Sequence, residues 1–311
     1  MALSDLRGAP LSLQVRARNP CYDGFLSQIQ PQGFRATMSV SYEAVLDVSQ
    51  DSVLFLSGLL HQEQARRGTR AGTRALGTYK QAVLVLRWFF DDTRMVALAR
   101  DNAIATSTAY AYRDEGIKVL AQRRPSLHGA LLAAKMAGHT HVILDGTLIE
   151  TDRIHTPGPT PGVDAWWSGK HKHHGGNIQV VSAPDGWPLW TSGVRPGREH
   201  DTTAARTDPV LLQRIRDWVD DDGTALADLG YEGEAGLLRI PVKKTKGSAL
   251  TIDQQSYNAV HGALRALGER ANSLLKTTFK VLRRIRGCPW RIGDITAAAL
   301  VLLHLEHGRT T

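Results

Sequence analysis

The chain has 311 residues, about the length of two domains, and its contents of 42% hydrophobic and 22% charged residues are those of a globular protein. Its longest uninterrupted apolar run, over residues 297–303, is far shorter than the ~18 residues that a membrane span requires. Lysine and arginine number 38 against 30 acidic residues, a net charge of +8 that favours a polyanionic partner. With only two cysteines, Cys21 and Cys288, the chain has no disulfide framework or cysteine-based zinc site, which suits a reducing cytoplasm.

Residues 1–41 are predicted to be a poorly ordered N-terminal extension. They are rich in arginine and lack the apolar core of a signal peptide. We therefore exclude them from the fold prediction.

Residues 42–125 are predicted to be wholly helical, because apolar residues recur at helical spacing. A short helix over 93–101, a turn over 102–106 and a helix to about 124 are typical of a helix-turn-helix, whose second helix enters the DNA major groove. A small helical bundle without DNA contact has the same pattern and stays open. The candidates for DNA contact on the second helix are Ser107, Thr108, Tyr110, Arg113 and Lys118.

After residue 125 the pattern changes to strands mixed with helices, which indicates an α/β domain with a mixed sheet over 126–311. The expected strands cover 139–152, 177–185, 189–197, 225–230 and 237–244, and the expected helices cover about 201–218, 257–282 and 293–304.

Two aspartates are placed where strands usually carry apolar residues. Asp145 and Asp228 each directly follow a buried-looking apolar run, where an ionised carboxylate needs a cation or hydrogen bonds to offset its lost hydration. One such residue is commonly a strand-end cap. Two of them in a basic protein favour a shared divalent cation, and oxygen ligands suit magnesium or manganese.

A third acid lies on the predicted helix over 257–282. At ~100° per residue, one narrow stripe of this helix holds Arg265, Glu269, Asn272 and Lys276. The opposite side, which we expect to pack on the core, holds Val260, Leu264, Leu267, Ala271, Leu274, Leu275 and Leu282. A solvated stripe of salt-bridging side chains is the alternative.

Six short motifs occur in one order along the second half of the chain. They are DGT at 145–147, SGK at 168–170, PDG at 184–186, PGREHD at 196–201, ADLGYEG at 227–233 and ERANSLLK at 269–276. In these motifs the chain resembles the DDE transposases of bacterial insertion sequences, specifically the IS-five group related to Harbinger-type endonucleases. The resemblance implies an RNase H-like catalytic domain preceded by an all-α helix-turn-helix DNA-binding domain.

The resemblance also implies a catalytic and metal-binding triad of Asp145, Asp228 and Glu269. Arg265, Glu269 and Lys276 match the R-x3-E-x6-K signature of related transposases, but Gly262 stands where that signature has tyrosine. The implied cofactor is a pair of Mg²⁺ ions, for which Mn²⁺ can substitute, and these ions activate the attacking oxygen and stabilise the leaving oxygen.

The implied activity is that of a transposase, which binds the terminal inverted repeats of its insertion sequence, cleaves strands and joins them to target DNA. Its expected partners are double-stranded DNA and further copies of the chain, in the bacterial cytoplasm at the nucleoid and away from membranes. Two alternatives stay open: a DDE-type endonuclease without integration activity, and an inert DNA-binding regulator, against which the intact triad argues.

Several further residues are expected to contact DNA. Residues 239–291 contain 12 lysines and arginines against two acids, a balance typical of phosphate binding. Within the helical stripe, Lys276 is expected at a phosphate as a point charge, beside Arg265 and Asn272. Lys170 and Lys172 are expected to contact phosphate from a glycine-rich loop.

Two neighbouring pairs of residues have open roles. His200 and Asp201 match the family motif and are expected to support the site, although Asp201 is equally a helix N-cap candidate. Trp166 and Trp167 either anchor the loop, which we favour, or stack on an unpaired base.

Overall fold

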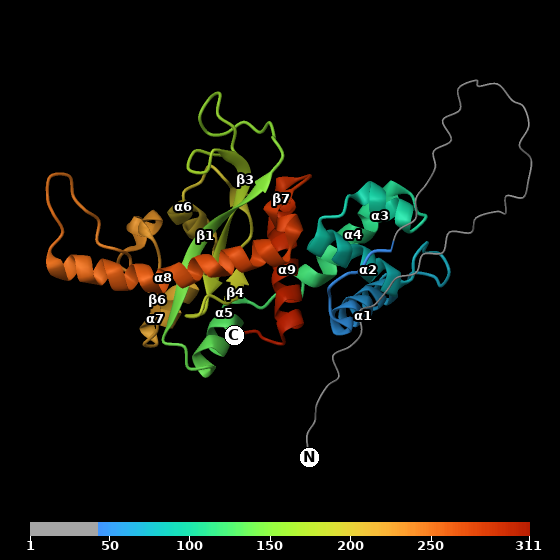
Figure 1. The fold of residues 1–311 in the computed structure, drawn as a ribbon, viewed down its shortest axis with the longest axis horizontal. Coiled ribbons are helices and arrows are strands. Elements are labelled where there is room, and N and C mark those ends of the chain that lie inside the picture. The colour runs from blue at the N-terminus through green and yellow to red at the C-terminus, as the bar shows by residue number, and fades with distance from the viewer. Residues whose placement is uncertain (1–42) are drawn as a thin grey trace, which may run out of the picture.

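The N-terminal part of the protein is helical in the computed structural model, which describes residues 43–311 (Figure 1). The extension over 1–41 lies outside the described residues. The helical region was predicted to start at residue 42, but residues 43–49 precede the first helix. The Ser49 hydroxyl caps this helix by accepting the backbone N–H of Ser52 at 3.2 Å. The helices are α1 (Gln50–Arg66), α2 (Thr78–Asp91), α3 (Met95–Asp101), α4 (Thr106–Ala121) and α5 (Leu127–Met136).

The predicted short helix, turn and longer helix are present as α3 and α4. The chain turns between them at Ala103, whose backbone is left-handed with φ of 52°. Helices α1, α2 and α4 enclose a core that includes Leu56, Leu60, Phe89 and Leu120. This part of the fold follows from the helical spacing of the apolar residues.

Strand β1 (His141–Thr151) is the centre of a mixed sheet. It pairs antiparallel with β3 (His173–Ser182) and parallel with β6 (Thr224–Leu226) and β7 (Arg284–Ile285). Three short strands pair antiparallel with β3: β2 (Trp167–Ser168), β4 (Pro188–Thr191) and β5 (Arg195–Pro196). The predicted α/β class with a mixed sheet is confirmed.

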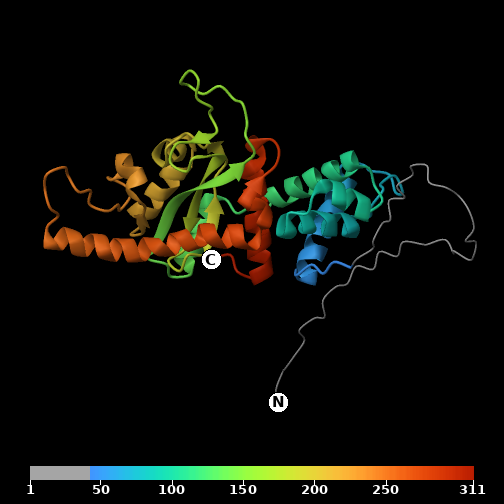
Figure 2. The same ribbon diagram turned by 45° about the horizontal axis from the view of Figure 1, so that its top comes forward.

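The remaining helices cover this sheet. Helix α8 (Ile252–Thr278) crosses β1 and β3, and α9 (Ile292–His307) lies between β4 and the helical region, in contact with α1 and α4 (Figures 1 and 2). Because α9 has protein on both sides, nearly all of its side chains are buried, which accounts for the apolar run over 297–303. Among the described residues, no helix is both long and apolar enough to cross a membrane.

Several predicted elements have different bounds, and the strand expected over 189–197 is two short strands, β4 and β5. The helix expected over 201–218 is two helices, α6 (Asp201–Thr207) and α7 (Leu211–Asp220), because Pro209 interrupts it. The strand expected over 237–244 is only an isolated bridge between Leu226 and Arg239, and Pro241 cannot donate to a ladder. Helix α8 begins at Ile252 rather than 257, behind a capping box formed by Thr251 and Gln254, and ends before 282. Three short 3-10 helices complete the chain: η1 (Leu229–Glu234), η2 (Lys280–Arg283) and η3 (Pro289–Arg291).

The packing predicted for α8 is wrong in its first half. Val260 is 63% exposed, and Leu264 and Leu267 are each 36% exposed. The first part of α8 extends beyond the sheet (Figure 1). The helix meets the sheet at Gly268, where a Cβ would stand 2.6 Å from the Ile143 side chain. This close approach brings the polar stripe of α8 over β1.

Candidate active site

Asp145 lies in the middle of β1, so it is not a strand-end cap. The strand continues to Thr151, and Asp145 and Gly146 lie between two buried runs, residues 142–144 and 147–149. The Asp145 side chain is 14% exposed, and its Oδ2 accepts a hydrogen bond from Asn272 Nδ2 at 2.9 Å. The nearest cationic group, Arg265 Nη1, stands 4.0 Å from Asp145 Oδ1. One amide hydrogen bond and a guanidinium at 4.0 Å therefore offset little of the hydration that the Asp145 carboxylate loses on burial.

Asp228 is placed beside Asp145 by strand register. Leu226 of β6 is paired in parallel with Ile143 of β1, so two residues further along each chain Asp228 and Asp145 arrive at the same level. The Asp228 carboxylate caps η1 and accepts the Gly230 backbone N–H at 2.8 Å. The two predicted aspartates thus come from neighbouring strands.

Asp201 brings a further carboxylate to the same place. A Cβ on Gly146 would stand 2.3 Å from Asp201 Oδ1, and a Cβ on Gly230 would stand 2.8 Å from Asp228 Oδ1 and 3.1 Å from Asp201 Oδ2. The two glycines leave room for the three carboxylates. The N-cap of α6 is His200, so the alternative of Asp201 as an N-cap is wrong.

Burial, together with the neighbouring carboxylates, raises the pKa of Asp145 to about 6. Burial is the largest cause, the charge of Asp228 the next, and the charges of Asp201 and Glu269 add to it while Arg265 opposes it. The site therefore holds more negative charge than its own cations offset, and a bound cation would relieve that excess.

Glu269 faces the same site but is tied to a neighbour. Its carboxylate pairs with Arg265 Nη2 at 2.7 Å, one turn away on α8, and its side chain is 61% exposed. Among residues 43–311, no three histidine, cysteine or acidic side chains stand close enough to hold a metal ion as they are. Carboxylate oxygens are donors that suit a hard divalent cation, and one Glu269 oxygen, Oε1, is engaged by Arg265.

The rest of the α8 stripe contacts β1, as its spacing indicated. Lys276 Nζ donates to Thr147 Oγ1 at 2.8 Å and to the Leu148 carbonyl at 3.0 Å, and burial lowers the pKa of Lys276. Asn272 Oδ1 is buried without a hydrogen-bond partner among the described residues. These side chains are held against the strand that carries Asp145.

The glycine-rich loop contributes one of its two predicted lysines to the site. Lys170 Nζ stands 3.4 Å from Asp201 Oδ2, whereas Lys172 is exposed in a left-handed turn with φ of 60°. Lys170 lines a cleft of about 530 Å³ that also includes Gly146, His200 and Asp201. The cleft is a place where a substrate can approach the acids.

Helix α4 is only partly available to a DNA partner, because its other side packs on α9. Thr108 is half-buried. Arg113, expected at the DNA surface, is instead packed: its side chain is 11% exposed, pairs with Asp114, and has its guanidinium 5.0 Å from the Trp88 ring centroid and 4.7 Å from that of Tyr110. The exposed members of the predicted set are Ser107, Tyr110 and Lys118.

A buried polar network behind Asp201 was missed in the sequence. Asn177 Nδ2 donates to Asp201 Oδ1 at 2.8 Å, Gln179 Nε2 donates to Asn177 Oδ1 at 2.9 Å, and the Tyr231 hydroxyl donates to Gln179 Oε1. Burial raises the pKa of Tyr231, and the charges of Asp201 and Asp145 raise it further. The available signal was the two amides at alternate positions beside the apolar residues 178, 180 and 181 of the strand.

Carboxylates gathered on adjacent strands are typical of enzymes that transfer phosphoryl groups with divalent cations. The model of the DDE superfamily endonucleases matches residues 144–304, more than half of the chain, and the chain belongs to that family. A probable transposase for insertion sequence element IS702 from Microchaete diplosiphon is 25% identical over 202 residues, which are 63% of this chain and 68% of the relative. The predicted resemblance to the DDE transposases of insertion sequences is confirmed.

One solved structure, a crystal structure of a pre-cleavage Mos1 transpososome, aligns over 84% of this chain and 97% of its own at 9% identity. Its TM-score of 0.17 is too low to carry an argument about fold.

Proposed function

We propose that this chain is a DNA transposase of the IS-five group, which binds the terminal inverted repeats of its insertion sequence, cleaves DNA strands and transfers them to target DNA. The observation that carries the proposal is the convergence of Asp145, Asp201 and Asp228 with few cations of their own. The family match supports a nuclease-type enzyme.

In this proposal, residues 126–311 are an RNase H-like catalytic domain. Asp145, Asp228 and Glu269 would hold two Mg²⁺ or Mn²⁺ ions, with Asp201 as a supporting carboxylate. Bound ions supply the charge that activates the attacking oxygen and stabilises the leaving oxygen of a phosphodiester.

The chain's own residues orient these acids and the DNA. Asn272 orients Asp145, and Asn177 orients Asp201, each through a hydrogen bond to the carboxylate. Lys276 is held on β1, where one further ammonium proton can contact a phosphate of the DNA. Arg265 contacts both Asp145 and Glu269 and reduces the repulsion between these two carboxylates.

Recognition of the element ends is proposed for residues 42–125, with α3 and α4 as the helix-turn-helix. Ser107, Thr108 and Tyr110 are then the groove contacts, while Arg113 fixes Tyr110 in place. Several copies of the chain would act together on two element ends, in the bacterial cytoplasm at the nucleoid.

The test is a cleavage assay on DNA carrying the candidate element ends, with and without Mg²⁺. The full chain should cleave at the ends and produce joined strands, whereas Asp228→Asn should bind the same DNA and cut none of it. Cleavage without joining identifies an endonuclease that does not integrate. Binding without any cleavage by the natural chain identifies an inert regulator.

Recognition is tested in the full chain, because removing residues 42–125 would uncover α9. Tyr110→Ala should reduce the preference for element ends over random DNA in a gel-shift competition. Tyr257→Ala is the matched control, since both tyrosines are similarly exposed, at 44% and 40%, and only Tyr110 lies on α4. Equal preference in the two variants would place recognition outside α4.

A further inference from the structure

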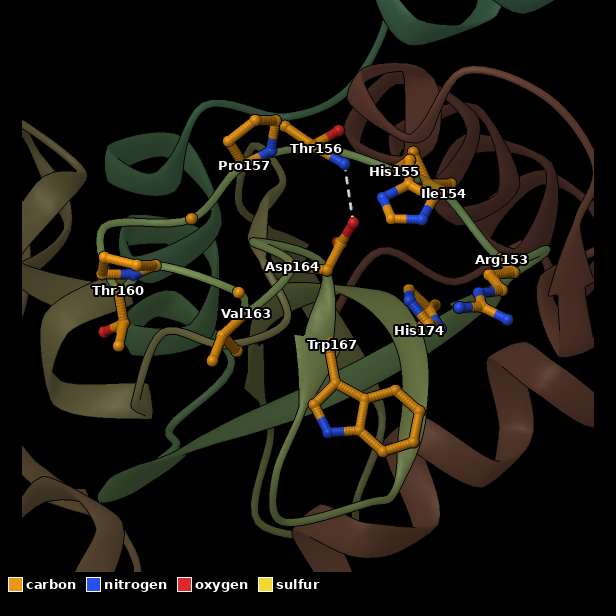
Figure 3. A pocket seen from close by; sticks show the side chains of 13 residues that line it. Arg153, Ile154, His155, Thr156, Pro157, Thr160, Val163, Asp164, Trp167 and His174 are labelled. Atoms are coloured by element: carbon orange, nitrogen blue, oxygen red, sulfur yellow. Dashed lines mark hydrogen bonds between the residues drawn. The ribbon is translucent and has the colours of Figure 1, made fainter.

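A pocket of about 760 Å³ lies at one side of the sheet, between the loop that follows β1 and the paired strands β2 and β3 (Figure 3). Residues 153–164 form its outer wall, and Trp167 and His174 form its inner wall. The two rings are in edge contact, with centroids 5.1 Å apart. The inner wall is therefore aromatic.

Strand alternation explains why one of two neighbouring tryptophans lines this pocket. Trp166 is 1% exposed and packs against Trp290, with ring centroids 4.9 Å apart. Its successor Trp167 points to the other side of the strand and is half-buried. The anchoring role that the sequence allowed both residues thus belongs to Trp166, and Trp167 is left with an aromatic surface in the pocket.

The outer wall is held open by its own hydrogen bonds. Asp164 Oδ2 accepts the Thr156 backbone N–H at 2.6 Å, and Asp164 Oδ1 accepts the Trp166 backbone N–H at 2.8 Å (Figure 3). The only acid among the lining residues is thereby satisfied by backbone. The other ionisable lining residues are Arg153, His155 and His174, and Arg153 has no acidic partner among residues 43–311. An anionic ligand with a flat ring would find both an aromatic and a cationic wall here.

The pocket adjoins the active-site cleft, because Trp167 lines both. Trp167 is paired with His174, five residues along β3 from Gln179, which is paired with Gly146. At ~3.3 Å per residue this separation is about 17 Å. A DNA strand that has a phosphate at the acids can therefore reach Trp167 with a base only a few nucleotides away.

We propose that this pocket binds an unpaired nucleobase of the DNA strand, stacked against Trp167, with Arg153 at an adjoining phosphate. The inference rests on the proposed function, because it takes DNA as the substrate. Stacking on an aromatic side chain tolerates any base, so the pocket would hold a displaced base without reading its sequence.

The experiment measures binding of a fluorescein-labelled ten-residue oligothymidylate by anisotropy, in EDTA, to the full chain and its variants. Two competitors separate the contributions: a ten-residue oligomer with abasic spacers in place of all bases, and a blunt 20-base-pair duplex. Trp167→Ala should weaken oligothymidylate binding about tenfold and change the other two affinities less than twofold. Trp167→Phe should recover most of the loss, and Tyr257→Ala, an exposed aromatic residue on α8, should have no effect.

Two outcomes would overturn the proposal. One is unchanged oligothymidylate binding by Trp167→Ala. The other is an equal loss for the base-free oligomer, which would mean a backbone contact or a disturbed fold. Cleavage of element-end DNA in Mg²⁺ is measured separately. If the chain binds the oligothymidylate more tightly than the abasic oligomer but never cuts, the base-binding pocket stands and the proposed function is wrong. If the chain cuts without that preference, only the base-binding pocket is wrong.

Discussion

Carboxylates are withdrawn from water in both the helical region and the strand region, but their surroundings differ. In the helical region Glu115 is almost fully buried. Its carboxylate forms ion pairs with Arg74 and, at 3.3 Å, with Arg67, and it accepts a hydrogen bond from the Gln81 side-chain amide at 2.7 Å. The Glu63 carboxylate forms ion pairs with Arg66 and Arg67, and the hydrogen bond from Arg66 is the main reason that the pKa of Glu63 falls to about 2. These acids are fully partnered within the fold.

In the strand region Asp145 has one amide hydrogen bond and a guanidinium at 4.0 Å, and its pKa moves the opposite way, to about 6. Asp201 and Asp228 are close by and add to the negative charge. The difference shows how burial of an acid can be interpreted. Removing a partnered acid destabilises the fold by leaving its partners uncompensated, whereas a cluster of under-partnered acids is a candidate site for an external cation.

The largest expected effect concerns Glu269, the third acid of the proposed triad. Glu269→Gln should reduce strand cleavage at least about a hundredfold, since it removes charge needed to hold cations at the site. Glu234→Gln is the control, because Glu234 is close in sequence to Asp228 but pairs with Arg206 at 2.5 Å, away from the acids. Cleavage rates over a manganese titration decide between them. The reverse ranking would remove Glu269 from the triad.

The partnered acids should respond in stability instead. Glu115→Ala should lower the free energy of unfolding by about 3 kcal/mol, because it leaves the half-buried Arg74 guanidinium and the buried Gln81 amide without their partner. Urea denaturation measures the loss. Glu232→Ala, which breaks an exposed pair with Lys243, should cost less than about 1 kcal/mol. Similar costs for the two variants would mean that the Glu115 cluster is no better partnered than a surface pair.

Asp145 should destabilise the cation-free protein as the pH rises. Its folded-state pKa of about 6 exceeds the ordinary 3.8, so the folded state binds this proton more tightly. Its contribution to the free energy of unfolding is complete below about pH 4 and is lost as the pH rises through about 6. The free energy of unfolding of Asp145→Asn should therefore be higher than that of the natural chain by up to about 3 kcal/mol at pH 8 in EDTA. At pH 4 the two free energies should be nearly equal.

Denaturant unfolding at the two pH values checks this difference. Asp152→Asn is the control, because Asp152 is 51% exposed and pairs only with Arg284. Added Mg²⁺ should stabilise the natural chain at pH 8 and leave Asp145→Asn nearly unchanged. A less stable Asp145→Asn at pH 8 would show that Asp145 is already compensated.

The smallest effect is expected for an ion pair between the two regions. Arg286 pairs with Asp92 at 2.8 Å, and the arginine side chain is 53% exposed. Arg286→Ala should change the free energy of unfolding by about 0.5 kcal/mol or less, and the difference should shrink in 1 M NaCl. A loss of several kcal/mol that is insensitive to salt would show that this contact, rather than α9, holds the two regions together.

The comparison also shows what a single sequence can locate. The class of fold, the helices α3 and α4, and the pair Asp145 and Asp228 were all predictable, because each depends on a local pattern of apolar residues and the acids that interrupt it. The strand over 237–244 and the single helix over 201–218 were wrong because proline removes a backbone donor from each segment.

The sequence by itself determined the elements and the stripe of α8 that faces β1, since side-chain direction follows from the helix and strand periods. Only the tertiary structure decided that Asp201 joins Asp145 and Asp228, that Glu269 is held by Arg265, and that Trp167 lines a pocket while Trp166 is buried. Among these, the carboxylate cluster and the pocket depend on segments far apart in the chain that meet through sheet register and close approach at glycine. No local pattern in the sequence encodes those distances.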